Sequence, residues 1–400
     1  MASINTKPNV TTSMTMTQSF TGSDIFDGQI LHQRSALIVR DEQIVAIVDE
    51  QDTPDSAQSI ELSGGILVPG FVDLQVNGGG GILLNEEPTV EGIKRICSAH
   101  LPFGTTALLP TLITDTPQVT DAAINAGIAA HRAKVPGFIG LHLEGPHLDV
   151  TRKGAHDSAL IRPMATDDLQ RLIAAKNALP TLLVTVAPES ITNEQISTLA
   201  SAGVIVSLGH TNTSNSNATA AFETGASCVT HLFNAMSPLN HREPGLVGAT
   251  LASDTTYAGL IADGFHVDKT AIAIALAAKQ GSGKIFLVTD AMSTIGTDLK
   301  SFELNGRKIT RSDGRLTLAD GTLAGADLDM ISAIRFLVDS VGVEALEAFR
   351  MASAYPSQCI RASNTLGYLH KGASADLVHV SDALEIQRVW QQGRQVFTLH

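Results

Sequence analysis

Apolar and polar positions alternate in two different rhythms along the chain. Between Phe71 and Val288, short apolar runs are separated by longer amphipathic segments. The apolar runs, eight in number, are Phe71–Leu74, Thr106–Leu112, Phe138–Leu143, Thr181–Val186, Val204–Leu208, Cys228–Phe233, Tyr257–Ile261 and Lys284–Val288. Segments with helical periodicity are Val90–Leu101, Val119–Ala133, Thr166–Ala178, Asn193–Ala202 and Lys269–Lys279. Strands that alternate with helices in this number predict an α/β fold, a (β/α)₈ TIM barrel.

At both ends of the chain the pattern of apolar and polar residues differs from that of the barrel. Short β-type runs with polar turns fill the stretch from Ser19 to Leu67, and Ala375–Val380 and Val389–Phe397 also read as strands. The two ends therefore predict one small β-domain beside the barrel. We assign residues 17–68 and 367–400 to this β-sandwich domain, 69–366 to the catalytic barrel, and 1–16 to a disordered N-terminal extension.

An insertion interrupts the barrel pattern at about residues 299–325. It holds three turn dipeptides, Asn305-Gly306, Asp313-Gly314 and Asp320-Gly321, between short β-type runs, which predicts hairpins. Two helices are expected to follow, at Asp329–Val341 and Val343–Ala352.

Charge and cysteine usage exclude some partners. The net charge of the 400-residue chain is −13 and no basic run is present, so nucleic acid is not an expected partner. The first 20 residues lack the pattern of a signal peptide, and no apolar run is long enough for a membrane span. Three widely spaced cysteines, with no metal or disulfide pattern, indicate a reducing cytoplasm.

Polar and titratable residues follow the apolar runs where these end. They are Gln75 and Asn77, Glu144, His210, His231, Asp263 with His266, and Asp290. In a barrel such residues converge on one rim. A glutamate with two histidines is a common zinc set that leaves a fourth position for water, and Asp290 has the place and chemistry of a general base.

Eight motifs then follow one another along the chain. They are PGFVDLQVNGGGG, LHLEGP, KGAH, SLGHT, THLFNAM, REPG, ADGFHV and VTDAM. In this order the chain resembles the N-acetylglucosamine-6-phosphate deacetylases of the amidohydrolase superfamily, from about Thr17 to the C-terminus. The resemblance implies a metal-dependent barrel with a β-sandwich built from both chain ends. It also implies hydrolysis of the acetamide of N-acetyl-D-glucosamine 6-phosphate, in amino-sugar catabolism and recycling.

The resemblance implies a role for each matching residue. One divalent metal per subunit, Zn²⁺ first and Fe²⁺, Co²⁺ or Mn²⁺ as alternatives, is expected at Glu144, His210 and His231. Asp290 is the expected catalytic base and then acid, and His156 of KGAH is expected to polarise the acetamide carbonyl. For the phosphate, the implied ligands are Asn234, the backbone of Ala235, and Arg242 and His266 from a partner subunit of a homodimer. Gln75 and Asn77 replace the usual His-x-His of the superfamily and are read as vestigial second-metal positions.

Other readings stay open at this point. The galactosamine epimer is an alternative substrate, because a hydroxyl epimer leaves no mark in the motifs. A cyclic amidase or nucleobase deaminase of the same superfamily is expected to lack the pair Arg242 and Asn234. A non-catalytic sugar-phosphate-binding regulator on this scaffold is expected to have lost a metal ligand or Asp290, and none is lost. His100, His147, His241 and His379 are read as structural.

Overall fold

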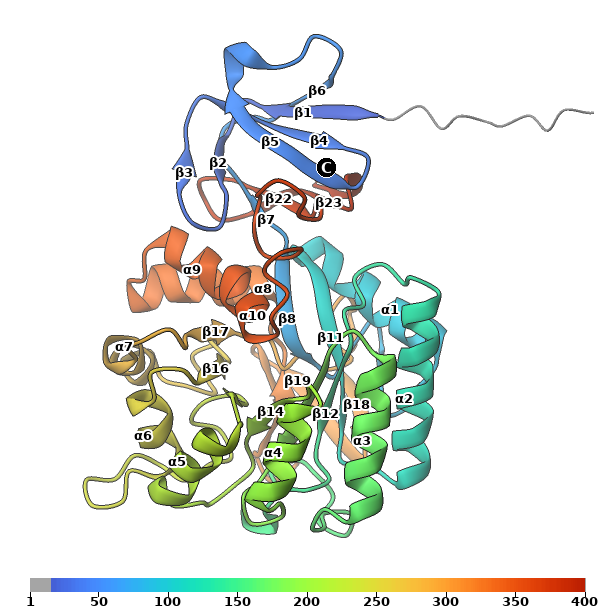
Figure 1. Cartoon of the computed structure of the whole chain (residues 1–400), viewed down its shortest axis with the longest axis vertical. Helices are drawn as coiled ribbons and strands as arrows, with labels where there is room; N and C mark the ends of the chain where they lie inside the picture. The colour runs from blue at the N-terminus through green and yellow to red at the C-terminus, as the bar shows by residue number, and fades with distance from the viewer. Residues whose placement is uncertain (1–15, 400) are drawn as a thin grey trace, which may run out of the picture.

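The computed structural model describes residues 16–399, so the expected N-terminal extension lies, apart from Met16, outside the described residues. Figure 1 shows a small β-domain stacked on one end of a larger barrel of strands and helices. The chain passes from one part to the other at Gly70, between β7 (Ile66–Pro69) and β8 (Phe71–Val76). The amino end of β8 therefore lies beside the β-domain, and the carboxyl end lies at the far end of the barrel.

The barrel consists of parallel strands in the order β17-β16-β15-β14-β13-β12-β11-β8. After β8 these are β11 (Thr105–Ile113), β12 (Leu141–Glu144), β13 (Leu182–Val186), β14 (Ile205–Leu208), β15 (Cys228–Val229), β16 (Tyr257–Leu260) and β17 (Ile285–Leu287). The two strands at the ends of this order, β8 and β17, meet through an isolated parallel bridge between Val76 and Ala291. The predicted barrel is confirmed. The sixth strand is shorter than expected, because the chain leaves the sheet after Val229.

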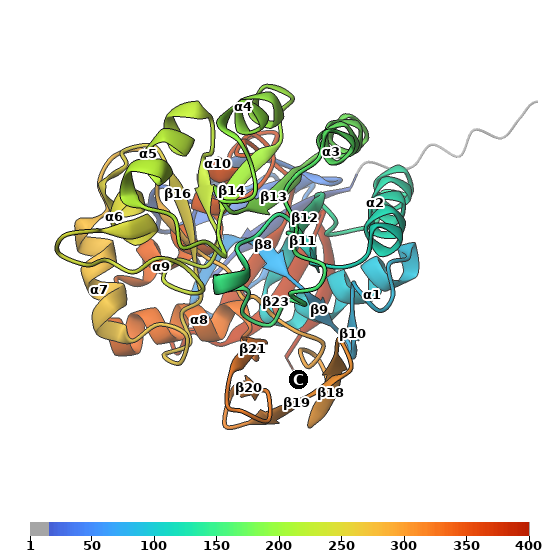
Figure 2. The same cartoon turned by 90° about the horizontal axis from the view of Figure 1, so that it is seen from below.

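Helices surround the barrel, as Figure 2 shows from the end opposite the β-domain. They are α1 (Val90–His100), α2 (Pro117–Arg132), α3 (Thr166–Ala178), α4 (Asn193–Ser201), α5 (Asn215–Thr224), α6 (Gly245–Ala252), α7 (Lys269–Ala278), α8 (Met330–Phe336), α9 (Ala345–Ala352) and α10 (Ala354–Cys359). A π-helical turn, Leu337–Val341, extends α8. The sequence pattern missed α5, α6 and α10. Almost all of α6 is apolar and buried, so it carries no amphipathic periodicity to detect.

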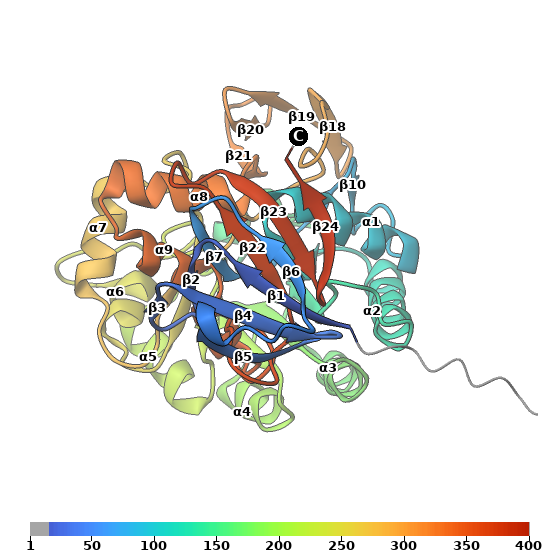
Figure 3. The ribbon, with the colours of Figure 1, turned by 90° about the horizontal axis from the view of Figure 1, so that it is seen from above.

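Strands from both chain ends form the β-domain. One sheet has the order β5-β4-β1-β6 and the other β24-β23-β22-β7-β2-β3. Their bounds are β1 (Thr17–Thr21), β2 (Asp24–Phe26), β3 (Leu31–His32), β4 (Ser35–Arg40), β5 (Gln43–Asp49), β6 (Gln58–Glu61), β22 (Leu377–Val380), β23 (Ile386–Gln391) and β24 (Arg394–Thr398). Figure 3 shows the C-terminal strands beside the N-terminal ones, and Leu377 pairs with Pro69. The assigned boundaries between the β-domain and the barrel, after residue 68 and after residue 366, stay a prediction.

One strand at the C-terminal end was predicted wrongly. The expected single strand Val389–Phe397 is a hairpin of β23 and β24, with Gln392 and Gly393 at φ values of 51° and 73° in its turn. Two successive residues with positive φ make the type I′ geometry that matches the twist of a hairpin. The polar residues Gln391 and Gln392, followed by Gly393, mark this turn in the sequence, and the prediction overlooked them.

The insertion forms its own antiparallel sheet after β17. Its strands, in sheet order, are β18 (Ser301–Leu304), β19 (Arg307–Ser312), β20 (Arg315–Thr317) and β21 (Leu323–Ala326). The first two turns are at Asn305-Gly306 and Asp313-Gly314, where all four φ values are positive. In Figure 2 this sheet lies at the rim of the barrel, near the short strands β9 (Gly78–Gly79) and β10 (Ile82–Leu83). The predicted hairpins are present.

Candidate metal centre and active site

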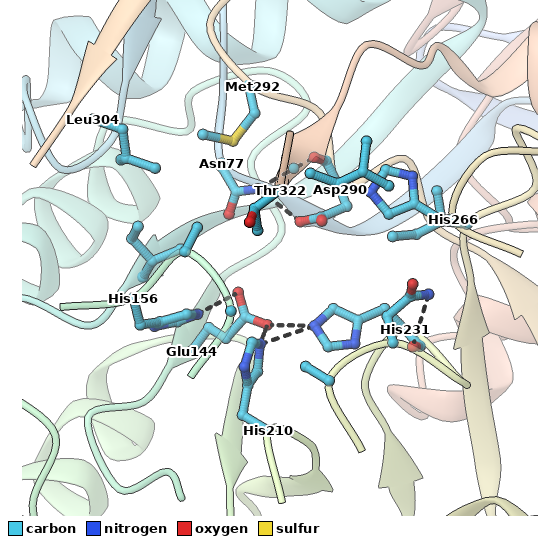
Figure 4. A pocket seen from close by; sticks show the side chains of 18 residues that line it. Asn77, Glu144, His156, His210, His231, His266, Asp290, Met292, Leu304 and Thr322 are labelled. Carbon is cyan, nitrogen blue, oxygen red and sulfur yellow. Dashed lines mark hydrogen bonds and ion pairs between the residues drawn. The ribbon is translucent and has the colours of Figure 1, made fainter. Parts of the chain in front are cut away.

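A cavity of about 260 Å³ opens at the carboxyl end of the barrel strands. Its walls come from the residues that follow β8, β12, β14, β15, β16 and β17, and from the insertion sheet. Figure 4 shows the polar side chains of these elements turned toward one another. The convergence predicted from the strand ends is therefore present in the fold.

Glu144, His210 and His231 form a tight cluster in this cavity, and all three are buried. Glu144 Oε1 lies 3.2 Å from His210 Nε2 and 3.0 Å from His231 Nε2. The two Nε2 atoms are themselves 3.0 Å apart. These separations approach the edge of about 3.3 Å of a tetrahedron with metal–ligand bonds of about 2.0 Å.

The chemistry of the three donors also fits a cation. His210 Nδ1 lies 2.9 Å from the carbonyl oxygen of Arg152, to which only a protonated Nδ1 can donate, so Nε2 of the neutral ring carries the lone pair. Burial alone raises the pKa of Glu144, but the adjacent His210 and His231 outweigh this effect and hold that pKa well below its usual range, so Glu144 is a carboxylate. A carboxylate and imidazole lone pairs that converge at such distances repel unless a cation or proton lies between them. The cluster therefore fits a divalent metal that accepts N and O ligands.

The backbone has an unusual conformation where these side chains are presented. His210, His231 and Asp290 have φ values of 48°, 32° and 51°. Residues other than glycine seldom adopt positive φ, and the cost is of order 1 kcal/mol or more for each. The chain turns abruptly at the end of each strand, and the surrounding hydrogen bonds hold that turn. The resulting direction of each side chain is into the cavity (Figure 4).

His156 approaches the cluster from the loop after β12. Its Nε2 lies 3.8 Å from Glu144 Oε2. His156 Nδ1 lies 2.8 Å from the hydroxyl of Thr114 and accepts the backbone N–H of the same residue at 3.3 Å, so we assign the ring proton to Nε2. Burial lowers the pKa of His156 to about 3, so the ring is neutral at physiological pH. His156 therefore offers one N–H donor to the cavity and no charge.

Asp290 lies across the cavity from His156 and contacts both amides of the first strand. Asn77 Nδ2 donates to Asp290 Oδ1 at 2.7 Å, and Gln75 Nε2 donates to the same oxygen at 3.1 Å. Gln75 Nε2 also lies 3.2 Å from Glu144 Oε1. Burial, followed by the negative charge of Glu144, raises the pKa of Asp290 to about 6. A carboxyl group whose pKa lies near physiological pH can both accept and return a proton.

Asn234, Ala235 and His266 also line the cavity. Asn234 and Ala235 belong to the turn after β15, where Ala235 has a φ of 48°. His266 Nδ1 hydrogen-bonds to Asp263 Oδ2 at 2.6 Å, so Nε2 is the ring atom left for a ligand. His266 was expected to reach over from a partner subunit, and for this chain's own cavity that expectation is wrong. The turn after β16 brings His266 directly to the rim.

Arg242 is the predicted site residue that the fold does not bring to the others. It is exposed on the loop that joins β15 to α6, which extends from the body beside α5 (Figure 1), and it does not line the cavity of its own chain.

Known proteins match this chain over most of its length. The sequence pattern of the amidohydrolase family matches residues 66–396, which cover the whole barrel and the strands that return from the C-terminal end. This chain belongs to the amidohydrolase family. Among curated proteins, this amidohydrolase is 43% identical over 336 residues to N-acetylgalactosamine-6-phosphate deacetylase of Shewanella sp. (strain ANA-3), which covers 84% of each chain.

Other relatives are named for the glucosamine epimer. The amidohydrolase is 35% identical over 345 residues to N-acetylglucosamine-6-phosphate deacetylase of Haemophilus influenzae, covering 86% of this chain and 89% of the relative. A crystal structure of N-acetylglucosamine-6-phosphate deacetylase from Pasteurella multocida superposes with a TM-score of 0.91 at 34% identity, covering 95% of this chain and 99% of that one. Both kinds of relative thus share most of the length of this chain, and the glucosamine relative of known structure also shares its architecture.

Several residues that line the cavity of this amidohydrolase carried no signal in the sequence. Thr322, Leu323 and Gly325 come from the insertion sheet, and Leu304 with Met292 forms an apolar wall (Figure 4). The three turn dipeptides predicted the hairpins, but not that the hairpins fold back over the barrel mouth. That placement depends on contacts between distant parts of the chain, such as the hydrogen bond from the Arg307 guanidinium to the carbonyl of Ala155.

The histidines read as structural lie apart from the metal cluster. His100, His147 and His379 each hydrogen-bond to a backbone carbonyl oxygen, of Gly78, Arg162 and Gly64 respectively. His241 is exposed on the loop that also carries Arg242. Among residues 16–399, no helix of this amidohydrolase is long and apolar enough to cross a membrane.

Proposed function

We propose that this amidohydrolase hydrolyses the acetamide of N-acetyl-D-glucosamine 6-phosphate to D-glucosamine 6-phosphate and acetate. One observation carries the proposal. A Glu-His-His metal cluster, a neutral N–H donor on His156 and a carboxylate of raised pKa on Asp290 line one cavity, which also extends to Asn234 and His266. This combination suits the hydrolysis of an amide whose far end carries an anion.

Glu144, His210 and His231 hold one divalent ion in this proposal, with Zn²⁺ first and Fe²⁺, Co²⁺ or Mn²⁺ as alternatives. When bound, such an ion polarises a carbonyl oxygen and lowers the pKa of water from 15.7 to about 7. The positions usually held by histidines in two-metal members are occupied by Gln75 and Asn77. Their amides donate to Asp290, which disfavours a second cation there.

The remaining chemistry belongs to side chains of this chain. His156 donates its Nε2–H to the acetamide oxygen and stabilises the negative charge that develops there. Asp290 accepts a proton from the attacking water and then delivers it to the sugar nitrogen, because an amine anion is a very poor leaving group. Hydrogen bonds from Gln75 and Asn77 keep Oδ1 of Asp290 occupied, so Oδ2 is the oxygen available for this transfer.

The phosphate of the substrate lies at the side of Asn234, the backbone N–H of Ala235 and His266. Arg242 of a partner subunit adds a planar, permanently charged donor, so the working form is a homodimer with composite sites. Mixing an inactive Asp290→Asn protein with an inactive Arg242→Ala protein should restore activity on subunit exchange. No recovery despite proven exchange would show that each site is built from one chain.

The galactosamine epimer is the second candidate substrate, because the relative that is 43% identical is named for N-acetylgalactosamine 6-phosphate. In either case we assign the enzyme to amino-sugar catabolism and recycling in the cytoplasm. The test is acetate release from both epimers, each with and without the 6-phosphate, after chelation and reloading with single metals. Faster acetate release from the phosphorylated sugars than from the unphosphorylated ones supports the proposal. No release from any sugar with any metal would favour a non-catalytic sugar-phosphate-binding protein.

A further inference from the structure

The barrel has a seam between its first and last strands. β8 and β17 stand at the two ends of the strand order and are joined by the bridge between Val76 and Ala291. Beyond that bridge, Asp290 N donates to Gln75 O at 2.9 Å, and Asn77 N donates to Ala291 O at 2.9 Å. These contacts lie at the carboxyl end of the seam. Deeper in the barrel, a side chain replaces the backbone carbonyl groups as the hydrogen-bond acceptor at the seam.

That side chain is Asp73 of β8, which is completely buried. Asp73 Oδ2 accepts the hydroxyl of Thr289 at 2.6 Å, and the backbone N–H of Thr289 donates to the carboxylate at 3.3 Å. Asp73 Oδ1 also accepts the backbone N–H of Gln75 at 3.1 Å. One carboxylate thus satisfies an N–H group from each side of the seam, where a closed sheet would use backbone carbonyls.

The Thr289 contact bears directly on the next residue. Asp290 holds a φ of 51°, which a side chain other than glycine keeps only when its neighbours fix it. On the C-terminal side, Ala291 O accepts from Asn77 and Gly78, and Ala326 N donates to Asp290 O at 2.9 Å. On the N-terminal side, Asp290 N donates to Gln75 O, and the preceding residue, Thr289, is held by Asp73. Asp73 therefore anchors one flank of the strained turn.

We propose that Asp73 is a positioning residue that closes the seam between β8 and β17 and, through Thr289, fixes the direction of the Asp290 carboxylate. Asp73 touches neither the cavity nor the metal cluster, so it acts only through Thr289 and Gln75. This inference rests on the proposed role of Asp290 in proton transfer. It explains why a carboxylate, which costs much to bury, lies within the buried strand β8.

Asp73→Asn is the main test, because it keeps the shape of the side chain but leaves one oxygen to accept from three donors. These donors are the hydroxyl and backbone N–H of Thr289 and the backbone N–H of Gln75. A displacement of a catalytic group by about 1 Å costs about 10²-fold in rate. We expect kcat for acetate release to fall about 10- to 100-fold, with KM and bound metal unchanged. A role confined to folding would lower the melting temperature without this selective loss in kcat.

Asp376→Asn is the matched control. Asp376 is also buried, accepts a backbone N–H (from Gln392, at 2.8 Å), and lies beside β22 in the β-domain. It should lose stability and keep kcat. Hydrogen exchange of the peptide that spans residues 284–292 should accelerate in Asp73→Asn and stay unchanged in Asp376→Asn, which reports on positioning without any activity measurement.

Thr289 supplies a second pair of variants in case Asp73→Asn does not fold. Thr289→Ser keeps the hydroxyl and should keep kcat, whereas Thr289→Val removes it at nearly constant volume and should lower kcat. Wild-type kcat in Asp73→Asn or Thr289→Val, together with an inactive Asp290→Asn, would overturn the positioning role alone. Undiminished acetate release by Asp290→Asn would instead overturn the proposed role of Asp290 in the reaction.

Discussion

Replacing His266 by alanine separates phosphate binding from the chemistry at the amide. Its ring is 8% exposed, is held by the 2.6 Å contact of Nδ1 with Asp263, and lines the cavity with Asn234 and Ala235. A hydrogen bond from His266 Nε2 to a charged phosphate would contribute about 1.5–3 kcal/mol. At about 1.4 kcal/mol per factor of ten, the loss in kcat/KM should be about 10- to 150-fold on the phosphorylated sugar.

Most of this loss should be in KM, because the phosphate contact is made in the ground state and in the transition state alike. The assay is acetate release by wild type and His266→Ala, with the N-acetyl sugar supplied with and without its 6-phosphate. On the unphosphorylated sugar the variant should match wild type, since the partner group is absent. His147→Ala is a matched control, because the ring of His147 is buried and is held through Nδ1, by the backbone carbonyl of Arg162, but lies outside the cavity.

An equal loss on both sugars would refute the reasoning. In that case His266 would act on the reacting amide, or its removal would disturb the turn after β16, and not the binding of a phosphate. A loss confined to kcat on the phosphorylated sugar would mean that the contact forms only in the transition state.

Three further outcomes are expected. Glu144→Gln and His210→Ala should each lose bound metal and nearly all turnover, because three protein ligands leave no redundancy; full metal occupancy by elemental analysis in either variant would contradict the ligand set. Gel-filtered protein should retain about one metal per subunit, since amides are poor ligands for a transition metal, and two tightly held equivalents would show otherwise. Hydrogen bonds from Arg162 hold the pKa of Asp168 at about 2, below its usual value. A carboxyl of depressed pKa stabilises the fold above about pH 4 and loses that contribution as the pH falls toward about 2. Asp168→Asn should therefore lower stability by about 1 kcal/mol at pH 7, after allowance for solvent screening, and by little near pH 2; a pH-independent difference in thermal melts would argue against the ion pair.

The sequence by itself determined the architecture and the inventory of reactive groups. Apolar runs that alternate with helical segments specify a parallel barrel. The strands of such a barrel are buried on both faces and therefore read as continuous apolar runs, and the amphipathic period of the helices between them can be recognised from the sequence alone. The same runs end in Glu144, His210, His231 and Asp290. Because the carboxyl ends of barrel strands share one rim, the convergence of these four follows from their order in the chain.

Only the tertiary structure decided which of these groups touch and from which side. The turn after β16 brings His266 into its own chain's cavity, and Arg242 is left exposed on a loop. The amides of Gln75 and Asn77 meet the carboxylate of Asp290, and Asp73 meets Thr289 across the seam, over sequence separations of 213 to 216 residues. Local periodicity cannot encode such pairs, because they depend on how the first and last strands of the barrel come together. The sequence names the side chains at each strand end, and the closure of the barrel sets their partners and their directions.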